Sequence, residues 1–353
     1  MRNTNIYEIM ELAVKEKASD IHLVNELHPA VRKDGQLVQF KDFYVNTPEW
    51  LEEQVNLLCN EKQREILNTK KQVDFSVEHA GFRFRVHIYY QKYTPSLILR
   101  LINSKIPKFE DLHLPPGINR FLELHDGLVL VTGVTGSGKS TTLASMIDHI
   151  NRTQSKNIIT IEDPIEYVHT HKMSIVNQRE VGQDVLSFAE AIKSAMRADP
   201  DILLVGEMRD LETIQNAITM AETGHLVFGT LHTKSCPETI DRIIDVFPEA
   251  QQQQIRIQLS NTLRGVINQR LVPKVGGGRV PIVEIMYVTD AIRALIKEGG
   301  NINAIKDEML MSSKKVGSQT VYQSVAELLK KGLITQETAI KNVDDLMLLK
   351  KFL

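Results

Sequence analysis

One segment of this sequence has the residue types and spacing of a phosphate-binding loop. Residues 133–140 read GVTGSGKS and fit the pattern G-x-x-x-x-G-K-[ST]. The apolar run 128–131 precedes this segment, and a helical pattern opens at Ser140. Backbone N–H groups of such a loop, together with the N-terminus of the following helix, bind phosphate oxygens. We therefore expect Lys139 to reach the outer phosphates of a nucleotide.

The residues expected to contact the nucleotide belong to this loop and to the first turn of the helix. They are Gly133, Thr135, Gly136, Ser137, Gly138, Lys139, Ser140 and Thr141. The Ser140 hydroxyl is expected to hold Mg²⁺. A chance match in a glycine-rich turn is the alternative, and the strand before the loop and the helix after it both argue against that reading.

Two carboxylates follow the next apolar run. Residues 157–161 read as a buried strand, which Pro164 ends, leaving Glu162 and Asp163 at its carboxyl end. In parallel α/β sheets, ligands bind at the carboxyl ends of the strands. We therefore expect both side chains near the phosphates, with a helix N-cap or a surface ion pair as the alternative role.

A third carboxylate, Glu207, follows the apolar run 202–205. Many P-loop enzymes place an aspartate at the end of this strand to hold Mg²⁺ indirectly, but Gly206 occupies that place here. The carboxylate on the metal side is therefore expected from Glu162 or Asp163. Glu207 remains as the group that orients or deprotonates the attacking water.

Further polar residues stand where another strand ends. The segment 225–233 is apolar and closes with His232 and Thr233. We expect these two residues near the γ-phosphate, where they would report its presence.

Arginines alternate with apolar residues in the N-terminal part of the chain. Arg83 and Arg85 lie on one face of the predicted strand 82–90, and Arg100 lies within the predicted strand 96–102. Guanidinium groups supplied from outside a phosphate loop stabilise charge on a transferring phosphoryl group. The alternative is that these arginines are solvated charges on the open face of a small sheet.

The length and composition limit the class of protein. At roughly 100–200 residues per domain, 353 residues suggest two or three domains. A net charge of −2 gives no general attraction to nucleic acid or to an anionic membrane. Cys59 and Cys236 are far apart, which fits a reducing compartment. Because no apolar run approaches the ~18 residues that span a bilayer, we expect a cytoplasmic protein without a transmembrane segment.

Pro107 and the run Pro115-Pro116-Gly117 predict where the chain divides. We expect an N-terminal domain over residues 1–102, a linker over 103–118 with a hinge at the second run, and a nucleotide-binding domain over 119–353. The second domain alternates strands and helices, which predicts an α/β fold with a parallel sheet, and ends in helices from about residue 288.

Four local patterns predict element ends. Asp34-Gly35 predicts a hairpin turn, and Thr47-Pro48 predicts the start of a helix. A helix is expected over 211–222 before Gly224, and a short amphipathic helix over 291–298 before Gly299.

Taken in order, the nucleotide segments resemble the motifs of the secretion ATPase superfamily. Residues 133–140, 161–166, 206–210 and 231–233 are similar to its Walker A, Asp box, Walker B and His box motifs. Residues 18–23 and 82–85 resemble its N-terminal signatures. Four motifs in the right order are more specific than any one of them.

This resemblance implies a PAS-like N-terminal domain and a RecA-like P-loop ATPase domain with a helical C-terminal extension. It also implies a homohexameric ring that hydrolyses ATP with Mg²⁺, with sites between the domains that Arg85 and Arg100 would face. Arg83 is left open between this role and a solvated sheet face. ATP binding would close the two domains, and hydrolysis and release would reopen them.

Within the superfamily, the chain resembles the retraction motors of type IV pili. It is short, it lacks a four-cysteine zinc module, and residues 291–298 read AIRALIKE where the retraction segment reads AIRNLIRE. The two departures are Ala294 and Lys297, and lysine keeps the charge but loses the bidentate geometry of arginine. The implied partner is a pilus platform protein, at the inner face of the cell membrane.

Three other functions remain open from the sequence. A pilus assembly or type II secretion ATPase would use the same motifs. A nucleic-acid motor of RecA type is disfavoured by the near-neutral charge and by the lack of a basic stripe with interleaved aromatic residues. A nucleotide-gated scaffold would bind ATP without hydrolysing it.

Overall fold

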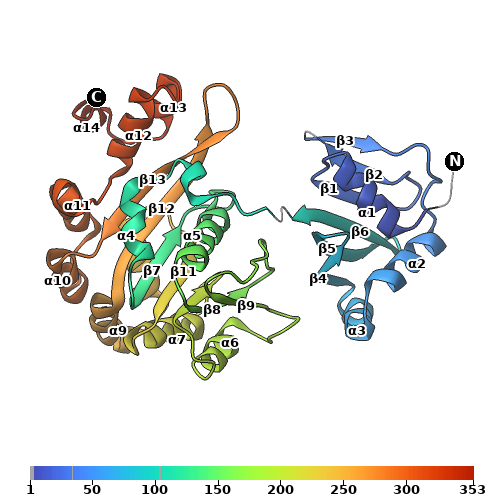
Figure 1. The fold of residues 1–353 in the computed structure, drawn as a ribbon, viewed down its shortest axis with the longest axis horizontal. Helices are drawn as coiled ribbons and strands as arrows, with labels where there is room; N and C mark the ends of the chain where they lie inside the picture. Colours follow the sequence, from blue (N-terminus) through green and yellow to red (C-terminus); the bar gives the residue numbers. More distant parts are fainter. Residues whose placement is uncertain (1–3, 34, 103–104) are drawn as a thin grey trace. The chain divides into compact units, whose positions relative to one another are not determined.

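The chain forms two compact units, which are described separately. The computed structural model describes residues 4–33, 35–102 and 105–353, apart from the side chains at 314 and 315 (Figure 1). The first unit extends to Lys105, and the second covers Ile106–Leu353.

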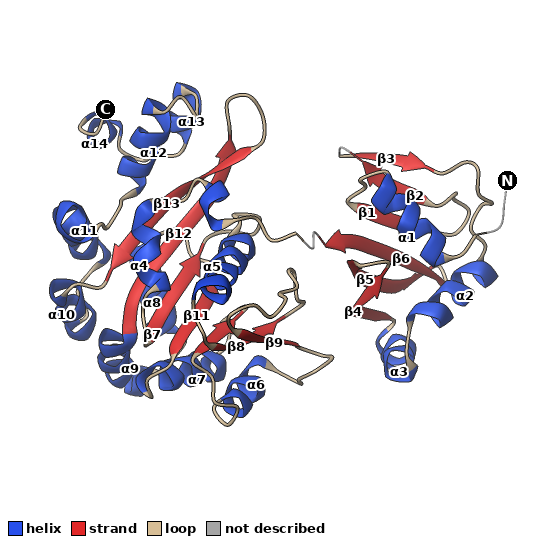
Figure 2. Ribbon diagram, in the orientation of Figure 1, coloured by secondary structure: helices blue, strands red, loops and turns tan. Residues whose placement is uncertain are grey.

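The first unit is an antiparallel sheet with three helices (Figure 2). Its strands lie in the order β3-β2-β1-β6-β5-β4. The strands are β1 (Asp20–Leu23), β2 (Ala30–Lys33), β3 (Gln36–Gln39), β4 (Gln72–His79), β5 (Phe82–Gln91) and β6 (Thr94–Ile102). The helices are α1 (Ile6–Lys15), α2 (Pro48–Leu58) and α3 (Glu61–Lys70).

Local sequence signals set the ends of these elements. Thr47 caps α2 by accepting a hydrogen bond from the Trp50 N–H, and Pro48 is the first helical residue, as predicted. Strands β2 and β3 pair with Lys33 opposite Gln36, which leaves two residues for the predicted turn. Of these two, Asp34 lies outside the described residues.

The core of the first unit lies between the three helices and one face of the sheet. Phe84, Val86 and Ile88 alternate along β5 and are buried, while Arg85 between them is exposed. The residues packed with them include Ile6, Ile9, Met10, Leu23, Leu51, Val55, Leu67, Phe75, Leu97 and Leu99. The other face of the sheet therefore carries the arginines.

The second unit contains a seven-stranded sheet in the order β13-β12-β7-β11-β10-β8-β9. All neighbouring strands are parallel except β12 and β13, which pair antiparallel. The strands are β7 (Gly127–Thr132), β8 (Asn157–Glu162), β9 (Ile175–Glu180), β10 (Ile202–Val205), β11 (Leu226–Leu231), β12 (Leu263–Pro273) and β13 (Arg279–Tyr287). The predicted α/β fold with a parallel sheet is confirmed, with β13 as an antiparallel edge strand.

Helices cover both faces of this sheet (Figure 1). Successive residues of a strand point to opposite faces, and since β7, β10 and β11 are buried along their whole length, both faces must be covered. One face packs on α5 (Lys139–Thr153), α4 (Asn119–Leu122) and the 3₁₀ turns η1 (Phe109–Leu112) and η2 (Pro116–Ile118). The other packs on α6 (Phe188–Ala195), α7 (Leu211–Glu222), α8 (Cys236–Asp245), α9 (Glu249–Thr262), α10 (Asp290–Glu298) and α11 (Ile302–Val316).

The remaining helices form a smaller cluster at the far end of β12 and β13. They are α12 (Val321–Lys330), α13 (Gln336–Lys341) and α14 (Leu346–Lys350). Val272, Val280 and Ile282 supply the strand side of this cluster. The expected helical C-terminal extension is thus present, and α7 and α10 lie where helices were predicted.

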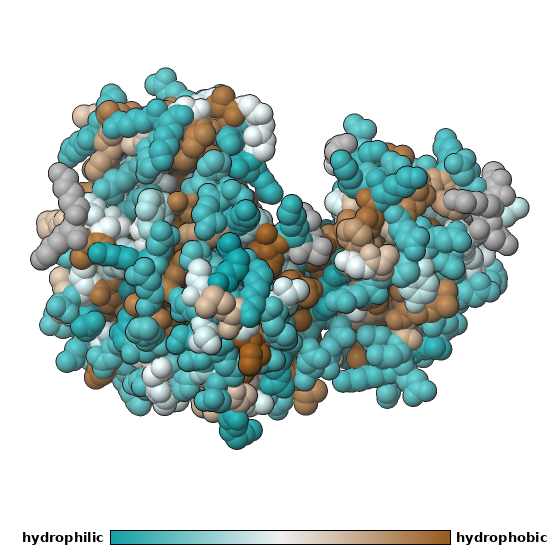
Figure 3. Space-filling view, in the orientation of Figure 1, coloured by the Kyte–Doolittle hydropathy of each residue, from teal (hydrophilic) through white to brown (hydrophobic). Residues whose placement is uncertain are grey.

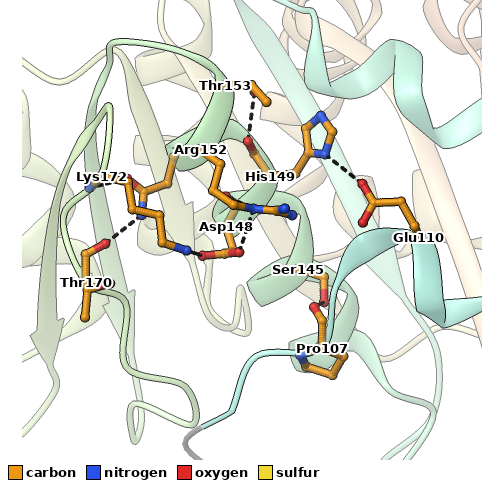
Figure 4. Close-up of polar contacts among 10 residues, drawn as sticks. Pro107, Glu110, Ser145, Asp148, His149, Arg152, Thr153, Thr170 and Lys172 are labelled. Carbon is orange, nitrogen blue, oxygen red and sulfur yellow. Dashed lines mark hydrogen bonds and ion pairs between the residues drawn. The ribbon is translucent and has the colours of Figure 1, made fainter.

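Residues 106–118, which the sequence placed in the linker, pack within the second unit. Phe109 and Ile118 are buried, and Ser145 Oγ of α5 donates a hydrogen bond to Pro107 O at 2.8 Å (Figure 4). The Tyr287 hydroxyl donates to Gly117 O. Within this unit, therefore, Pro115-Pro116-Gly117 is not a free connection.

Hydrophilic residues cover most of the face drawn in Figure 3. None of the helices formed by the described residues combines the length and the apolar character that crossing a membrane requires.

The first prediction concerns the stability of the second unit. Phe228 on β11 is fully buried, and Phe228→Ala should lower the free energy of unfolding by about 3–5 kcal/mol, because it removes apolar burial and leaves a cavity. Leu186→Ala, at a side chain that is 76% exposed, should change it by no more than about 0.5 kcal/mol. Urea unfolding measures both, and equal effects would contradict the described core.

Candidate nucleotide-binding and catalytic site

The phosphate loop connects the end of β7 to the start of α5. Gly133 has φ of 141°, and a Cβ there would lie 2.2 Å from Gln269 O. Gly138, the residue before the helix, has φ of 92°, in the left-handed region. Because residues other than glycine rarely adopt these conformations, the loop requires glycine at both places.

Lys139 lies folded over this loop. Its Nζ donates hydrogen bonds to Gly133 O at 2.8 Å and to Val134 O at 3.3 Å. Burial lowers the pKa of the Lys139 ammonium, while the charges of Glu207 and Glu166 act in the opposite direction. The ammonium therefore lies close to acidic groups and is held by neutral carbonyls that a phosphate can replace.

A buried hydroxyl in the loop also fits an anionic ligand. Ser137 Oγ is buried and has no hydrogen-bond partner among the described residues. A buried polar atom without a partner costs free energy, so a ligand that accepts its hydrogen bond is stabilised there. The loop thus has the donors that phosphate oxygens need.

Two amides on β12 support the loop and were not predicted. Gln269 Nε2 donates to Ser137 O at 2.8 Å, and Asn268 Nδ2 donates to Thr132 Oγ1 and Thr233 O, both at 2.9 Å. Both amides are buried. Two adjacent amides inside an apolar strand were the available sequence signal, since buried amides are usually hydrogen-bonded.

Glu207 and His232 meet at the carboxyl edge of the sheet. His232 Nε2 lies 3.0 Å from Glu207 Oε1, and Arg209 Nε donates to the same oxygen. Thr233, next in sequence, is buried. The structure therefore brings together the acid and the histidine that the sequence singled out, and it adds Arg209, which the sequence did not.

The glycine in place of the usual aspartate has a steric reason. The Gly206 N–H donates to Ile161 O at 2.7 Å. A Cβ at position 206 would lie 3.1 Å from that oxygen and 3.2 Å from Glu162 Cα. Because backbone atoms of β8 lie this close, a side chain at position 206 would require β8 to shift by a few tenths of an ångström.

Glu162 is held by two side-chain donors. Thr160 Oγ1 donates to Glu162 Oε1 at 2.7 Å, and Gln178 Nε2 donates to the same oxygen at 3.1 Å. Burial raises the pKa of the Glu162 carboxyl, and these two hydrogen bonds act to lower it. Asp163, the next residue, is exposed. The two neighbouring acids thus differ in environment.

One aromatic residue also contacts the start of α5. The hydroxyls of Tyr167 and Thr141 share a hydrogen bond of 2.9 Å. Thr141 was expected to contact the nucleotide, and the sequence offered no signal for Tyr167, because its role depends on how the loop after β8 folds.

The predicted arginines lie on the open face of the first unit's sheet, each beside a carboxylate. Arg100 Nε donates to Asp20 Oδ1 at 2.8 Å, and Arg85 Nη2 lies 3.6 Å from Asp74 Oδ1. Arg85 and Arg100 are cross-strand partners. Their role in nucleotide chemistry stays a prediction.

Oxygen donors at the site suit a hard divalent cation. Ser140 offers a hydroxyl in the first turn of α5, and Asp163 offers an exposed carboxylate. No cluster of three or more His, Cys, Asp or Glu side chains that could hold a metal occurs among the described residues. This set fits Mg²⁺, which is usually bound by few protein ligands together with water and phosphates.

A family model described as "Type II/IV secretion system protein" matches residues 3–341. The chain belongs to this family. The match covers residues of both units, so the chain resembles the family in the first unit as well as in the unit that contains the phosphate loop.

Relatives within this family are similar along nearly the whole chain. The type IV pilus retractation ATPase PilT of Pseudomonas aeruginosa is 47% identical over 340 residues, which cover 95% of this chain and 97% of that protein. A twitching motility protein of Neisseria gonorrhoeae is 46% identical over 317 residues, 88% of this chain and 83% of its own length. A crystal structure of the pilus retraction motor PilT with bound ADP has a TM-score of 0.91 at 49% identity and covers 99% of this chain and 100% of that chain.

The second prediction tests the geometry of the phosphate loop in this member of the type II/IV secretion system family. Gly133→Ala should lower nucleotide affinity by about 100-fold or more, because the new Cβ displaces the loop from Gln269 O. Gly182→Ala introduces similar backbone strain at φ of 86°, with no atom within 4 Å of the Cβ, and should change affinity by less than about threefold. Fluorescent ADP titration measures both, and unchanged binding by Gly133→Ala would contradict this loop geometry.

Proposed function

We propose that this chain is an ATP-hydrolysing motor that powers the retraction of type IV pili. The observation that carries the proposal is the meeting of the lysine-bearing loop with the Glu207–His232 pair at one edge of the sheet. Similarity to retraction ATPases over nearly the full length of both chains supports the same assignment.

The loop binds the phosphates, and Lys139 stabilises the charge on the γ-phosphate. Glu207 orients the attacking water through hydrogen bonding. The water oxygen forms a bond to the γ-phosphorus, the bond from the γ-phosphorus to the β-phosphate oxygen breaks, and both protons of the water leave on the phosphate product. The products are ADP and inorganic phosphate.

Two neighbours hold the proposed catalytic acid. His232 and Arg209 both contact Glu207 Oε1, so the carboxylate orientation depends on the ends of β10 and β11. A γ-phosphate close to His232 would compete for this contact. We infer that His232 reports the presence of the γ-phosphate, because it keeps its contact with Glu207 when the phosphate is absent and gives up that contact when the phosphate is bound.

Mg²⁺ supplies positive charge that stabilises the transferring phosphoryl group. Ser140 and Asp163 are the proposed ligands on this chain, and Glu162 is a further proposed catalytic carboxylate beside them. The different environments of Glu162 and Asp163 support separate roles. We propose that the exposed Asp163 binds the cation, whereas the two hydrogen bonds to Glu162 hold its carboxylate in one orientation.

As in the expectation from sequence, the working form is proposed to be a homohexamer of two-domain subunits, divided near residues 103–118. Its proposed location is the cytoplasm, at the inner face of the cell membrane, where it acts on a pilus platform protein. Successive ATP hydrolysis events in the ring would drive pilin disassembly, with no direct contact to nucleic acid.

The share of each relative's length that this chain matches favours retraction over secretion. The type II secretion system protein E of Xanthomonas campestris is 34% identical over 75% of this chain, and the match covers only 47% of that protein. The match to the Pseudomonas retraction protein covers 97% of its length. A deletion separates retraction from pilus assembly, because cells that lack a retraction motor retain surface pili, whereas cells that lack an assembly motor have none.

The third prediction concerns Glu207. Glu207→Gln keeps the size of the side chain but removes its charge, so it should retain ATP binding while kcat falls by on the order of 10²–10⁴-fold. A phosphate-release assay and fluorescent nucleotide titration measure the two effects. In a deletion strain, the variant should leave cells hyperpiliated and without surface motility.

Glu212→Gln is the matched control, because Glu212 is a second glutamate close in sequence whose side chain forms an exposed ion pair with Lys193 on helix α6. This control should restore motility and keep full ATPase activity. Retained hydrolysis by Glu207→Gln would reject Glu207 as the catalytic acid. A deletion strain without pili would reject retraction.

The fourth prediction concerns the arginines. Arg85→Ala and Arg100→Lys should each lower kcat by on the order of 100-fold without unfolding the first unit, because alanine would remove the proposed donor to the phosphates and lysine would lose the bidentate geometry of the guanidinium. Lysine at position 100 keeps a cation for the buried Asp20 carboxylate. Arg64→Ala, on helix α3, is the control. Normal rates for both variants would assign Arg85 and Arg100 to a solvated sheet face.

A further inference from the structure

The connection between β8 and β9, residues 163–174, contacts α5 near its C-terminal end. Asn151 Nδ2 donates to Thr170 O at 2.7 Å, and the Lys172 N–H donates to Asn151 Oδ1 at 3.1 Å. Lys172 also forms an ion pair with Asp148 (Figure 4). This part of the connection is therefore held to the same helix that begins at the phosphate loop.

The connection also contacts the first turn of α5, through the Tyr167–Thr141 hydrogen bond of 2.9 Å. Its two contact regions lie at opposite ends of one helix, and a helix is a rigid spacer. Any group that ties this connection to Glu162 therefore ties Glu162 to the phosphate loop.

Gln178 on β9 is such a group. Its Nε2 donates to Glu162 Oε1 at 3.1 Å and to Tyr167 O at 2.8 Å, and its Oε1 accepts from the His169 N–H at 2.7 Å. Gln178 pairs with Thr160 in the parallel ladder, so its side chain shares a face with Thr160 and Glu162.

A primary amide suits this position because it is neutral and offers two N–H donors together with a carbonyl acceptor. Both donors and the acceptor are used here. A carboxylate would lose both donors and would lie against the Glu162 carboxylate, and an apolar side chain would leave Tyr167 O and the His169 N–H without their partner.

We propose that Gln178 is a positioning residue for ATP hydrolysis, holding the Glu162 carboxylate at a fixed place relative to the phosphate loop through Tyr167 and α5. The inference rests on the proposed function. It assigns a role to a residue outside the four nucleotide motifs, and Gln178 acts through Glu162 without touching the nucleotide.

A simpler role for Gln178 is to hold the loop of Tyr167 and His169 in place. That role predicts a loss of stability and no special dependence on Glu162. The positioning role predicts a loss of kcat that vanishes when Glu162 can no longer act. The two roles therefore differ in a measurable way.

The fifth prediction uses Gln178→Met, which keeps the length of the side chain and removes its hydrogen bonds. We expect kcat for ATP to fall by about 10–100-fold, because a misplaced carboxylate loses alignment. KM for ATP and fluorescent ADP affinity should stay within about twofold, since the loop itself is unchanged. In a Glu162→Gln background, single-turnover rates should change by less than about twofold on adding Gln178→Met.

Asn177→Ala is the matched control, because Asn177 is the neighbouring residue on β9 and its amide bonds Asn157 instead of Glu162. It should keep the kcat of the unmodified chain. Gln178→Glu is the second variant, since it can still accept from the His169 N–H but cannot donate to Glu162. It should lose at least as much kcat as Gln178→Met.

Unchanged kcat in both Gln178 variants would overturn the inference, as would an equal loss with and without Glu162. A rise in KM that accounts for the whole effect, or a lowered melting temperature with normal kcat, would also overturn it in favour of the simpler loop role. If the unmodified chain and Asn177→Ala both failed to hydrolyse ATP, the proposed function itself would fail instead.

Discussion

The site depends on the placement of the N-terminus of α5 directly after β7. The backbone there turns through Gly133 and Gly138 in conformations that other residues rarely adopt. Backbone N–H groups of such a loop and of the first helical turn bind phosphate oxygens. Helix α5 keeps this position because it packs on one face of the sheet and contacts both residue 107 and the connection after β8. Movement of α5 would displace the loop and its supports together.

The acidic side of the site follows from parallel pairing. Strands β8, β10 and β11 run in the same direction, so Glu162, Glu207 and His232 come to one edge although they are far apart in sequence. Charges at this edge are already paired within the protein: Glu207 with His232 and Arg209, and Lys139 with carbonyl oxygens. A nucleotide must therefore exchange these contacts, which couples its arrival to the strand ends.

Polar side chains outside the motifs hold this arrangement together. Asn268 and Gln269 connect β12 to the loop and to the residue after His232, while Gln178 connects β9 to Glu162. Each is an amide with both donors and acceptor available, and each lies where an unpaired backbone group would otherwise be buried. Amides of this kind keep the reactive groups in place without adding charge to the site.

The sequence by itself determined the phosphate loop, the α/β class, the strands that carry Glu162, Glu207 and His232, and several helix ends. These depend on local signals: glycine spacing, apolar periodicity, caps and Pro or Gly at element ends. The tertiary structure decided which residues support the loop, how closely Gly206 approaches the backbone of β8, and that residues 106–118 pack within the second unit. Those outcomes depend on contacts between segments distant in sequence, such as β9 with β8 or Gly206 with Ile161, and no local pattern encodes such distances.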